Sequence, residues 1–240
     1  HTESSDLETF NVLKADLTIT PEITGDLVVD SEINITFTLP ADVNASSVVA
    51  TIDGMPAIVD LIDGTWVVSF DSLAAGDHIV TVGVIDDPNY NDAVANATFT
   101  VNKVDPEITI SDIKGHVGET VEATVTIAGG DATGFILYDD VYYIVENGEA
   151  TIFVVISTAG QNTVPVTYFG DEKYNNGSAT KEFNADKAAS TIVINGTNAI
   201  TTVENATVTI TVGPEGVTGA VIVSVDGEGK QYELDDGTVT

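Results

Sequence analysis

The chain contains no cysteine and no arginine, and its 240 residues carry only seven lysines. Without cysteine there is neither a disulfide scaffold nor a Cys-ligated zinc site, so each folding unit must be stable from its own core. The 38 acidic residues give a formal net charge of −31. Because phosphate recognition needs clustered Lys and Arg, this composition argues against nucleic acid as a partner.

Long apolar runs are also missing. No stretch approaches the ~18 consecutive apolar residues that cross a bilayer, so we expect no membrane insertion in this segment. The opening residues, HTESSDLETF, have neither a basic nor an apolar region of the kind that a signal peptide contains. What the chain does contain is 43% hydrophobic residues, rich in Val and Ile, together with abundant Thr. This composition favours ordered β-structure over disorder.

An internal repeat organises the sequence. Three segments share a phenylalanine that is followed four residues later by a lysine, at Phe10/Lys14, Phe99/Lys103 and Phe183/Lys187. The spacings of 89 and 84 residues suit one small β-domain each. We therefore expect the last strand of a preceding repeat in residues 1–14, complete repeats in 15–103 and 104–187, and in 188–240 an incomplete repeat that lacks its last strands.

Pairs of Asp, Asn and Gly residues divide the β-rich runs at matching places in each repeat. Type I′ hairpin turns need positive φ at both central residues, which these residue types tolerate best. The pairs are Asp53-Gly54, Asp139-Asp140, Asp226-Gly227, Asp63-Gly64, Asn147-Gly148 and Asp236-Gly237. Each repeat is therefore expected to contain two tight hairpins.

Between the turns, apolar and polar residues alternate with a period of two. In INITFTL (33–39) the odd-numbered positions are apolar, and VEATVTI (121–127) and ATVTITV (206–212) follow the same pattern. This period is typical of half-buried strands, and it places Trp66 in a core. About seven short strands per repeat, with turns every 8–12 residues, describe a Greek-key sandwich. The sequence thus predicts an all-β chain of tandem immunoglobulin-like Greek-key β-sandwich domains.

One loop occurs in both complete repeats, as VGVIDDPNYND (82–92) and as VTYFGDEKYNN (166–176). In the second copy, two carboxylates, a lysine and a tyrosine within four residues suggest a small chemical site. Glu172 and Lys173 are replaced by proline and asparagine in the first copy, however, so they are not part of the shared pattern. The shared residues suit a structural loop, since Asp bonds its own backbone and Tyr covers the end of a sandwich. We interpret six residues as loop-shaping: Asp87, Tyr90, Asn91, Asp171, Tyr174 and Asn175.

The motif YFGDEKY (168–174) before a final Phe strand, with the turns LAAGDH (73–78) and AGQN (159–162), resembles bacterial-type Ig-like domain repeats. Such repeats occur in surface adhesin-like proteins of bacteria and methanogenic archaea. The first repeat departs from the motif, with Val84 and Asp86 at the Tyr and Gly positions. The resemblance implies a secreted, cell-wall-associated stalk or adhesive array, and it carries over no catalytic residues.

Six Asn-x-Ser/Thr triplets are candidate glycosylation sites if the protein is exported. The asparagines are Asn34, Asn44, Asn96, Asn176, Asn195 and Asn205. The alternative is a polar strand face that is rich in Asn and Thr.

Two further features suggest binding. The hairpin LYDDVYYIV (137–145) carries Tyr138, Tyr142 and Tyr143, which we consider as a ligand platform for sugar rings. The competing interpretation is cross-strand pairing of these side chains within the hairpin.

The acidic loop DDPNYND (86–92) offers oxygen ligands for calcium, although its spacing matches no EF-hand. The competing interpretation is a solvated acidic surface.

No residue pattern indicates catalysis. His1, His78 and His116 lie far apart in the sequence, no glycine-rich phosphate loop precedes a helix, and no His pair has metal-ligand spacing. We therefore expect no catalytic, cofactor-binding or metal-ligating residues and no enzyme activity.

These observations favour a segment of an extracellular, cell-surface protein that serves as a rod-like spacer or adhesive stalk. Its expected partners are neighbouring Ig-like repeats, and host-cell or wall glycans or proteins. The alternatives are a carbohydrate- or receptor-binding Ig-like module and a self-associating subunit of a surface fibre that is completed by strand donation.

Overall fold

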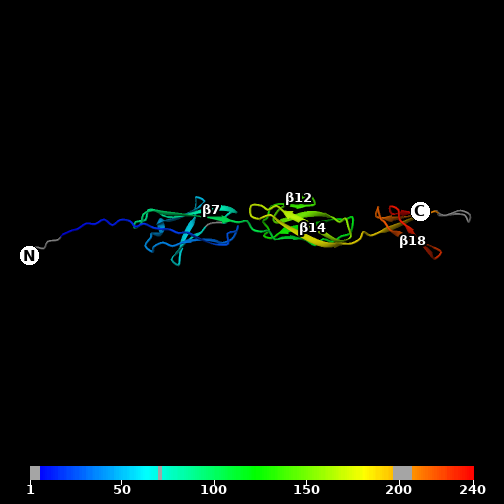
Figure 1. Ribbon diagram of the computed structural model, residues 1–240, viewed down its shortest axis with the longest axis horizontal. Helices are drawn as coiled ribbons and strands as arrows, with labels where there is room; N and C mark the ends of the chain where they lie inside the picture. The colour runs from blue at the N-terminus through cyan, green and yellow to red at the C-terminus, as the bar shows by residue number, and fades with distance from the viewer. Residues whose placement is uncertain (1–5, 70–71, 197–206) are drawn as a thin grey trace, which may run out of the picture. The chain divides into compact units, whose positions relative to one another are not determined.

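The computed structural model describes residues 6–69, 72–196 and 207–240, and Figure 1 shows that strands dominate them. One short 3-10 helix, Ala45–Ser47, is present. No helix among the described residues is long and apolar enough to span a membrane. The strands of the described residues form six sheets. By the order of their strands along the chain, we group these sheets into three successive pairs.

The first pair of sheets contains eight strands. One sheet has the order β1 (Glu22–Gly25), β2 (Ile33–Phe37), β6 (Thr65–Ser69), β5 (Ile58–Ile62). The other has the order β4 (Met55–Pro56), β3 (Val48–Ile52), β7 (Gly76–Val84), β8 (Ala93–Val101). Consecutive strands are divided between two antiparallel sheets, which is the Greek-key arrangement of an immunoglobulin-like sandwich.

The second pair of sheets contains seven strands. The smaller sheet has the order β13 (Glu149–Val155), β10 (Thr120–Ile127), β9 (Ile108–Ile110). The larger has the order β12 (Val141–Val145), β11 (Gly134–Tyr138), β14 (Gly160–Tyr168), β15 (Gly177–Ala185). The second pair therefore repeats the strand order of the first, except that it has no counterpart of β5.

The third pair is smaller. Its sheets have the orders β16 (Thr191–Gly196), β17 (Val208–Gly213), β20 (Thr238–Val239), and β18 (Ala220–Val225), β19 (Glu228–Glu233). Ile210 and Val212 are buried here, whereas Val208, which shares their alternation, is 39% exposed.

The apolar positions of the predicted alternation form the cores of the two complete sandwiches. In the first pair, Ile33, Ile35 and Phe37 of β2 are buried. Trp66 on the neighbouring strand is also buried and stacks on Phe37 with ring centroids 6.4 Å apart, so the prediction for Trp66 is confirmed. In the second pair, the inward positions of β10, β13 and β14 are almost completely buried: Ala123, Val125, Ile127, Ile152, Val154, Val164, Val166 and Tyr168.

The predicted hairpin turns are confirmed. All twelve residues of the six pairs have positive φ, from 47° at Asp63 to 88° at Gly227. Left-handed backbone at both central positions matches the right-handed twist of the flanking strands. A β-branched residue would be strained in this conformation, which explains why Asp, Asn and Gly occupy it.

The two complete sandwiches differ in one strand. In the first pair, β4 matches β3 over only two residue pairs before the chain passes to the other sheet as β5. In the second pair, β12 remains on β11 over five residue pairs. Pro56 lies at the end of β4, and its missing N–H limits further pairing there. The equivalent segment of the second pair contains no proline, and a longer edge strand results.

Candidate functional site

The loop shared by both repeats is organised around a carboxylate. The Asp87 side chain is completely buried and accepts hydrogen bonds from the backbone N–H of Asn44 (2.8 Å), Asn89 (2.8 Å) and Tyr90 (3.2 Å). Burial alone raises the pKa of this carboxyl, but the three N–H donors outweigh it and hold the pKa below its usual value. The carboxylate therefore organises backbone and is not free to react.

Asp171 repeats this geometry in the second repeat. It accepts from the backbone N–H of Thr133 (2.8 Å), Lys173 (2.8 Å) and Tyr174 (2.7 Å). Desolvation opposes these donors, and the pKa of Asp171 is nevertheless lowered, as it is for Asp87. The two loops differ in sequence, but in each the Asp carboxylate at the equivalent position accepts three backbone hydrogen bonds.

The tyrosines of the two loops also have matching partners. The Tyr90 hydroxyl donates to Asp42 (2.7 Å), and the Tyr174 hydroxyl donates to Asp131 (2.7 Å). Near each tyrosine the chain forms an isolated parallel bridge with the beginning of its own repeat, at Ala15 in the first and at Val104 in the second. Each loop therefore fastens the first residues of a repeat to its last β-hairpin.

The asparagines complete this junction. Asn91 donates its amide to Asp16, and Asn175 donates to Asp105, both over 2.8 Å. Lys173, which belongs to the second loop only, forms a 2.6 Å ion pair with Asp131 that raises the pKa of the lysine. The structure thus brings the six loop residues together in two equivalent junctions, with their polar groups bonded to backbone and to neighbouring side chains.

In the acidic loop of the first repeat, two carboxylates are bonded to the backbone, that of the buried Asp87 and that of the exposed Asp92. Asp87 faces backbone N–H groups, and Asp92 accepts from the backbone N–H of Asp86 (2.9 Å). Among the described residues, no cluster of three or more His, Asp or Glu side chains has metal-binding geometry. Calcium binding by this loop therefore stays a prediction, and no donor set visible in the described chain supports it.

The three candidate platform tyrosines lie on two faces of the β11–β12 hairpin. In the register, Tyr143 is opposite the buried Ile136, whereas Tyr142 is opposite Leu137, one position along. Since side chains alternate between the faces of a strand, Tyr142 points away from the core face, and Tyr138 and Tyr143 belong to that core face.

Tyr142 is instead joined by two phenylalanines that the sequence did not single out. Its ring contacts Phe135 edge-on with centroids 6.5 Å apart, and it contacts Phe169 at 5.7 Å with a 40° tilt. Ile144 lies opposite Phe135 on the same face. Phe135, Tyr142, Ile144 and Phe169 are between 44% and 64% exposed, and together they form what we call the aromatic face.

The sequon asparagines occupy different environments. Asn44 caps the 3-10 helix and accepts from the Ser46 N–H, whereas Asn34 is half-buried on the outer face of β2. Asn96, Asn176 and Asn195 are exposed. Asn205 lies outside the described residues. Glycosylation of these positions stays a prediction.

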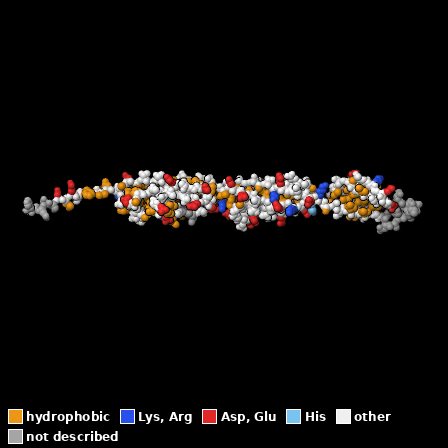
Figure 2. Space-filling model, turned by 90° about the horizontal axis from the view of Figure 1, so that it is seen from below, with side chains coloured by type: hydrophobic (Ala, Val, Ile, Leu, Met, Phe, Trp, Pro, Cys, Tyr) orange, Lys and Arg blue, Asp and Glu red, His pale blue; other side chains and the backbone are white. Residues whose placement is uncertain are grey.

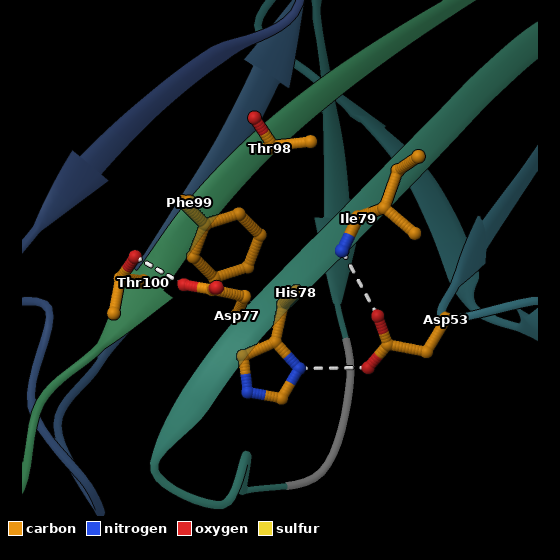
Figure 3. A pocket seen from close by; sticks show the side chains of 7 residues that line it. All are labelled: Asp53, Asp77, His78, Ile79, Thr98, Phe99 and Thr100. Atoms are coloured by element: carbon orange, nitrogen blue, oxygen red, sulfur yellow. Dashed lines mark hydrogen bonds and ion pairs between the residues drawn. The ribbon is translucent and has the colours of Figure 1, made fainter.

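An open pocket of about 450 Å³ lies around His78 in the first repeat, and Figure 3 shows the side chains that line it. His78 Nδ1 lies 2.7 Å from Asp53 Oδ2, and Nε2 lies 2.9 Å from the Ala74 carbonyl oxygen. Asp53 also accepts from the Ile79 N–H (2.9 Å). In the second repeat, Asn162 bonds the carbonyl of Thr158, four residues before it, as His78 bonds Ala74. This shared contact indicates a structural role for His78.

Both ring nitrogens of His78 face oxygen acceptors, so both can donate only if the ring is protonated. Burial of the ring lowers the pKa of His78, but the bonds to Asp53 and to Ala74 outweigh it, and the pKa is raised above that of ordinary histidine. Asp77 adds a second nearby carboxylate, which itself accepts from the Thr100 hydroxyl (2.6 Å).

A pH dependence of stability follows. The pKa of His78 is higher in the folded state than in the unfolded state, where it is about 6.5. The contribution of His78 to the free energy of unfolding is therefore complete below about pH 6.5, and it is lost as the pH rises through the pKa of the folded state. We expect urea unfolding of the chain to show a loss of about 1 kcal/mol between about pH 6 and about pH 9. In His78→Gln this loss disappears. An unchanged pH profile in the variant contradicts the assignment.

The sheet order defines the chain as a series of immunoglobulin-like sandwiches. Similarity is detectable to several solved structures, with TM-scores of 0.28 to 0.30 for three of them. The fibronectin(III)-like modules of Clostridium thermocellum CbhA are 15% identical, with a TM-score of 0.28, and the match covers 69% of this chain and 95% of theirs. The titin A168169 fragment and the titin domains z1z2 in complex with telethonin are each 11% identical, with TM-scores of 0.30, and each match covers 72% of this chain and 100% of theirs. No protein-family model matches the sequence, and comparison with curated proteins finds no significant match.

Proposed function

We propose that the chain is a non-catalytic segment of an extracellular, cell-surface adhesin-like protein, in which tandem immunoglobulin-like repeats act as a spacer or adhesive stalk. One observation carries the proposal: the most chemically rich motif of the sequence forms the same fastening junction in both complete repeats. Asp87 and Asp171 hold backbone N–H groups, and Tyr90 and Tyr174 lie beside the first residues of their own repeats. These bonds hold the entering chain to the last hairpin of its own repeat, which supports a spacer whose repeats stay folded under tension.

The surface charge supports the same role. Figure 2 shows acidic side chains distributed over the visible face with few lysines among them. With a net charge of −31, copies of the segment repel one another, which keeps a long array soluble. The short, turn-rich repeats also fold from local cores, so each can be stable without disulfides.

Stretching of single molecules of the full chain tests this proposal. Repeats that fold independently unfold one at a time, and each complete repeat of 84 to 89 residues releases about 30 nm of extended chain. We expect at least two force peaks separated by about this length. A single event that releases both repeats at once, or unfolding without measurable resistance, contradicts the spacer role.

A second candidate is a carbohydrate- or receptor-binding module, and the aromatic face favours it. The rings of Phe135 and Tyr142 are perpendicular, and Tyr142 and Phe169 are tilted by 40°. Rings in these orientations do not form one flat surface for stacked sugars, so a polypeptide ligand suits them better. A glycan array distinguishes the two ligand classes. Saturable binding of the full chain to a glycan favours a carbohydrate ligand over a polypeptide ligand.

A further inference from the structure

Strand β12 is an exposed sheet edge without the usual protection. It is the outermost strand of its sheet, and within the described residues no strand pairs with its free side. Its sequence, Val-Tyr-Tyr-Ile-Val, contains no proline, glycine or charge. Natural proteins normally shield such an edge with short strands, lysines, proline or bulges, because it is a template for pairing with another chain. The corresponding β4 of the first repeat is two residues long and contains Pro56.

The aromatic face adjoins this edge. Tyr142 and Ile144 belong to β12 itself, and they are 61% and 64% exposed. Phe135 on β11 and Phe169, which directly follows β14, extend the same apolar surface away from the edge. A strand that pairs with β12 would therefore place alternate side chains beside Tyr142 and Ile144 at the margin of the aromatic face, so that the main chain supplies affinity and these side chains supply selectivity.

The charges around the edge decide which partner it suits. Asp139 and Asp140 precede β12 and Glu146 follows it. The whole stretch 115–172 contains nine acidic residues and no lysine. A second copy that pairs antiparallel would place Asp139 and Asp140 beside Glu146 at both ends, and a parallel copy would place the aspartates beside each other. Like charges in opposed positions destabilise strand pairs, so self-association through this edge is disfavoured.

We infer that the β12 edge and the aromatic face bind an extended segment of another protein that is apolar in its middle and basic at both ends. Such a segment places cations opposite Asp139, Asp140 and Glu146 and presents apolar side chains to Tyr142 and Ile144. Its lysine or arginine side chains also gain favourable contacts with the faces of the exposed rings. This inference goes beyond the spacer role, and its failure leaves that role untouched.

The test is titration of the full chain with a labelled synthetic peptide, Lys-Lys-Val-Thr-Phe-Thr-Val-Lys-Lys, followed by fluorescence polarisation. We expect saturable binding that weakens as salt is raised from about 50 mM to about 500 mM, because the end charges are screened. A peptide with glutamate in place of the lysines should not bind. A peptide with proline in place of the two threonines should bind at least about tenfold more weakly, because proline alters the backbone that pairs with the edge.

Two matched variants locate the site. Ile144→Lys removes apolar contact and adds a charge that repels the peptide, so we expect an affinity loss of about tenfold or more. Ile58→Lys changes an isoleucine of similar exposure (67%, against 64% for Ile144) on edge strand β5 of the first repeat, and should leave the affinity within about twofold. The inference is overturned by absence of saturable binding, by equal losses in the two variants, by equal binding of the glutamate peptide, or by a dimer of the chain that Ile144→Lys dissociates.

Discussion

Replacement of Asp171 by alanine is expected to lower the free energy of unfolding of the second repeat by about 2–4 kcal/mol. The Asp171 carboxylate accepts hydrogen bonds from the backbone N–H of Thr133, Lys173 and Tyr174. Hydrogen bonds to a charged acceptor contribute more than neutral ones, and their removal leaves the three donors without a partner in a partly buried loop. The loop would then no longer hold Tyr174 against Asp131.

Chemical denaturation of the full chain, followed by a probe of the second repeat, measures this loss. Glu172→Ala is the matched control, since Glu172 is the exposed neighbour in the same loop and should change stability by less than about 0.5 kcal/mol. Asp171→Asn keeps one acceptor oxygen, so its effect should fall between those of the two alanine variants. If Asp171→Ala is as mild as Glu172→Ala, the loop is not organised by this carboxylate.

Comparison of the two repeats within one sequence is what made this loop predictable. Asp, Tyr and Asn recur at equivalent positions, while Glu172 and Lys173 do not. The hairpin turns were predictable for a similar reason, because positive φ restricts the residue types at a turn much more than strand positions are restricted. Local chemistry of this kind is readable directly from residue identity.

The path of the strand after the first hairpin could not be predicted. In the first repeat the chain leaves β3 after two pairs and joins β6 as β5, whereas in the second it stays on β11 as β12. In both segments apolar residues predominate or alternate with polar ones. The same residue pattern suits a strand in either of the two sheets, so it does not show which sheet the strand joins. The choice depends on pairing with residues distant in the sequence, with Pro56 the one local signal.

The composition of the aromatic face was missed for a related reason. Phe135 and Phe169 are 34 residues apart in the sequence and meet only because β11 pairs with β14. The contact between His78 and Asp53 could not be predicted either. The two residues are 25 positions apart, and the sequence alone does not reveal the register in which β3 and β7 pair. A contact between non-consecutive strands needs the topology as well as the pattern of residues.

The largest effect on packing is expected from Ile136→Ala in β11. Ile136 is completely buried and lies opposite Tyr143 on one side and Tyr168 on the other. Truncation to alanine loses the transfer free energy of three carbons and leaves a cavity that rigid neighbouring strands fill only in part. We expect the free energy of unfolding of the second repeat to fall by about 3–4 kcal/mol.

Ile144→Ala provides a strict comparison, because it makes the same chemical change in the same hairpin. Ile144 is 64% exposed on the aromatic face, so its truncation removes little buried area and should cost less than about 0.5 kcal/mol. Urea denaturation of both variants measures the difference. Equal costs would mean that the aromatic face is covered in the folded chain, and would remove the basis for a binding surface there. A large cost at Ile136 with a negligible cost at Ile144 means that the Ile144 side chain contributes little to the fold, which leaves this part of the aromatic face available to a partner.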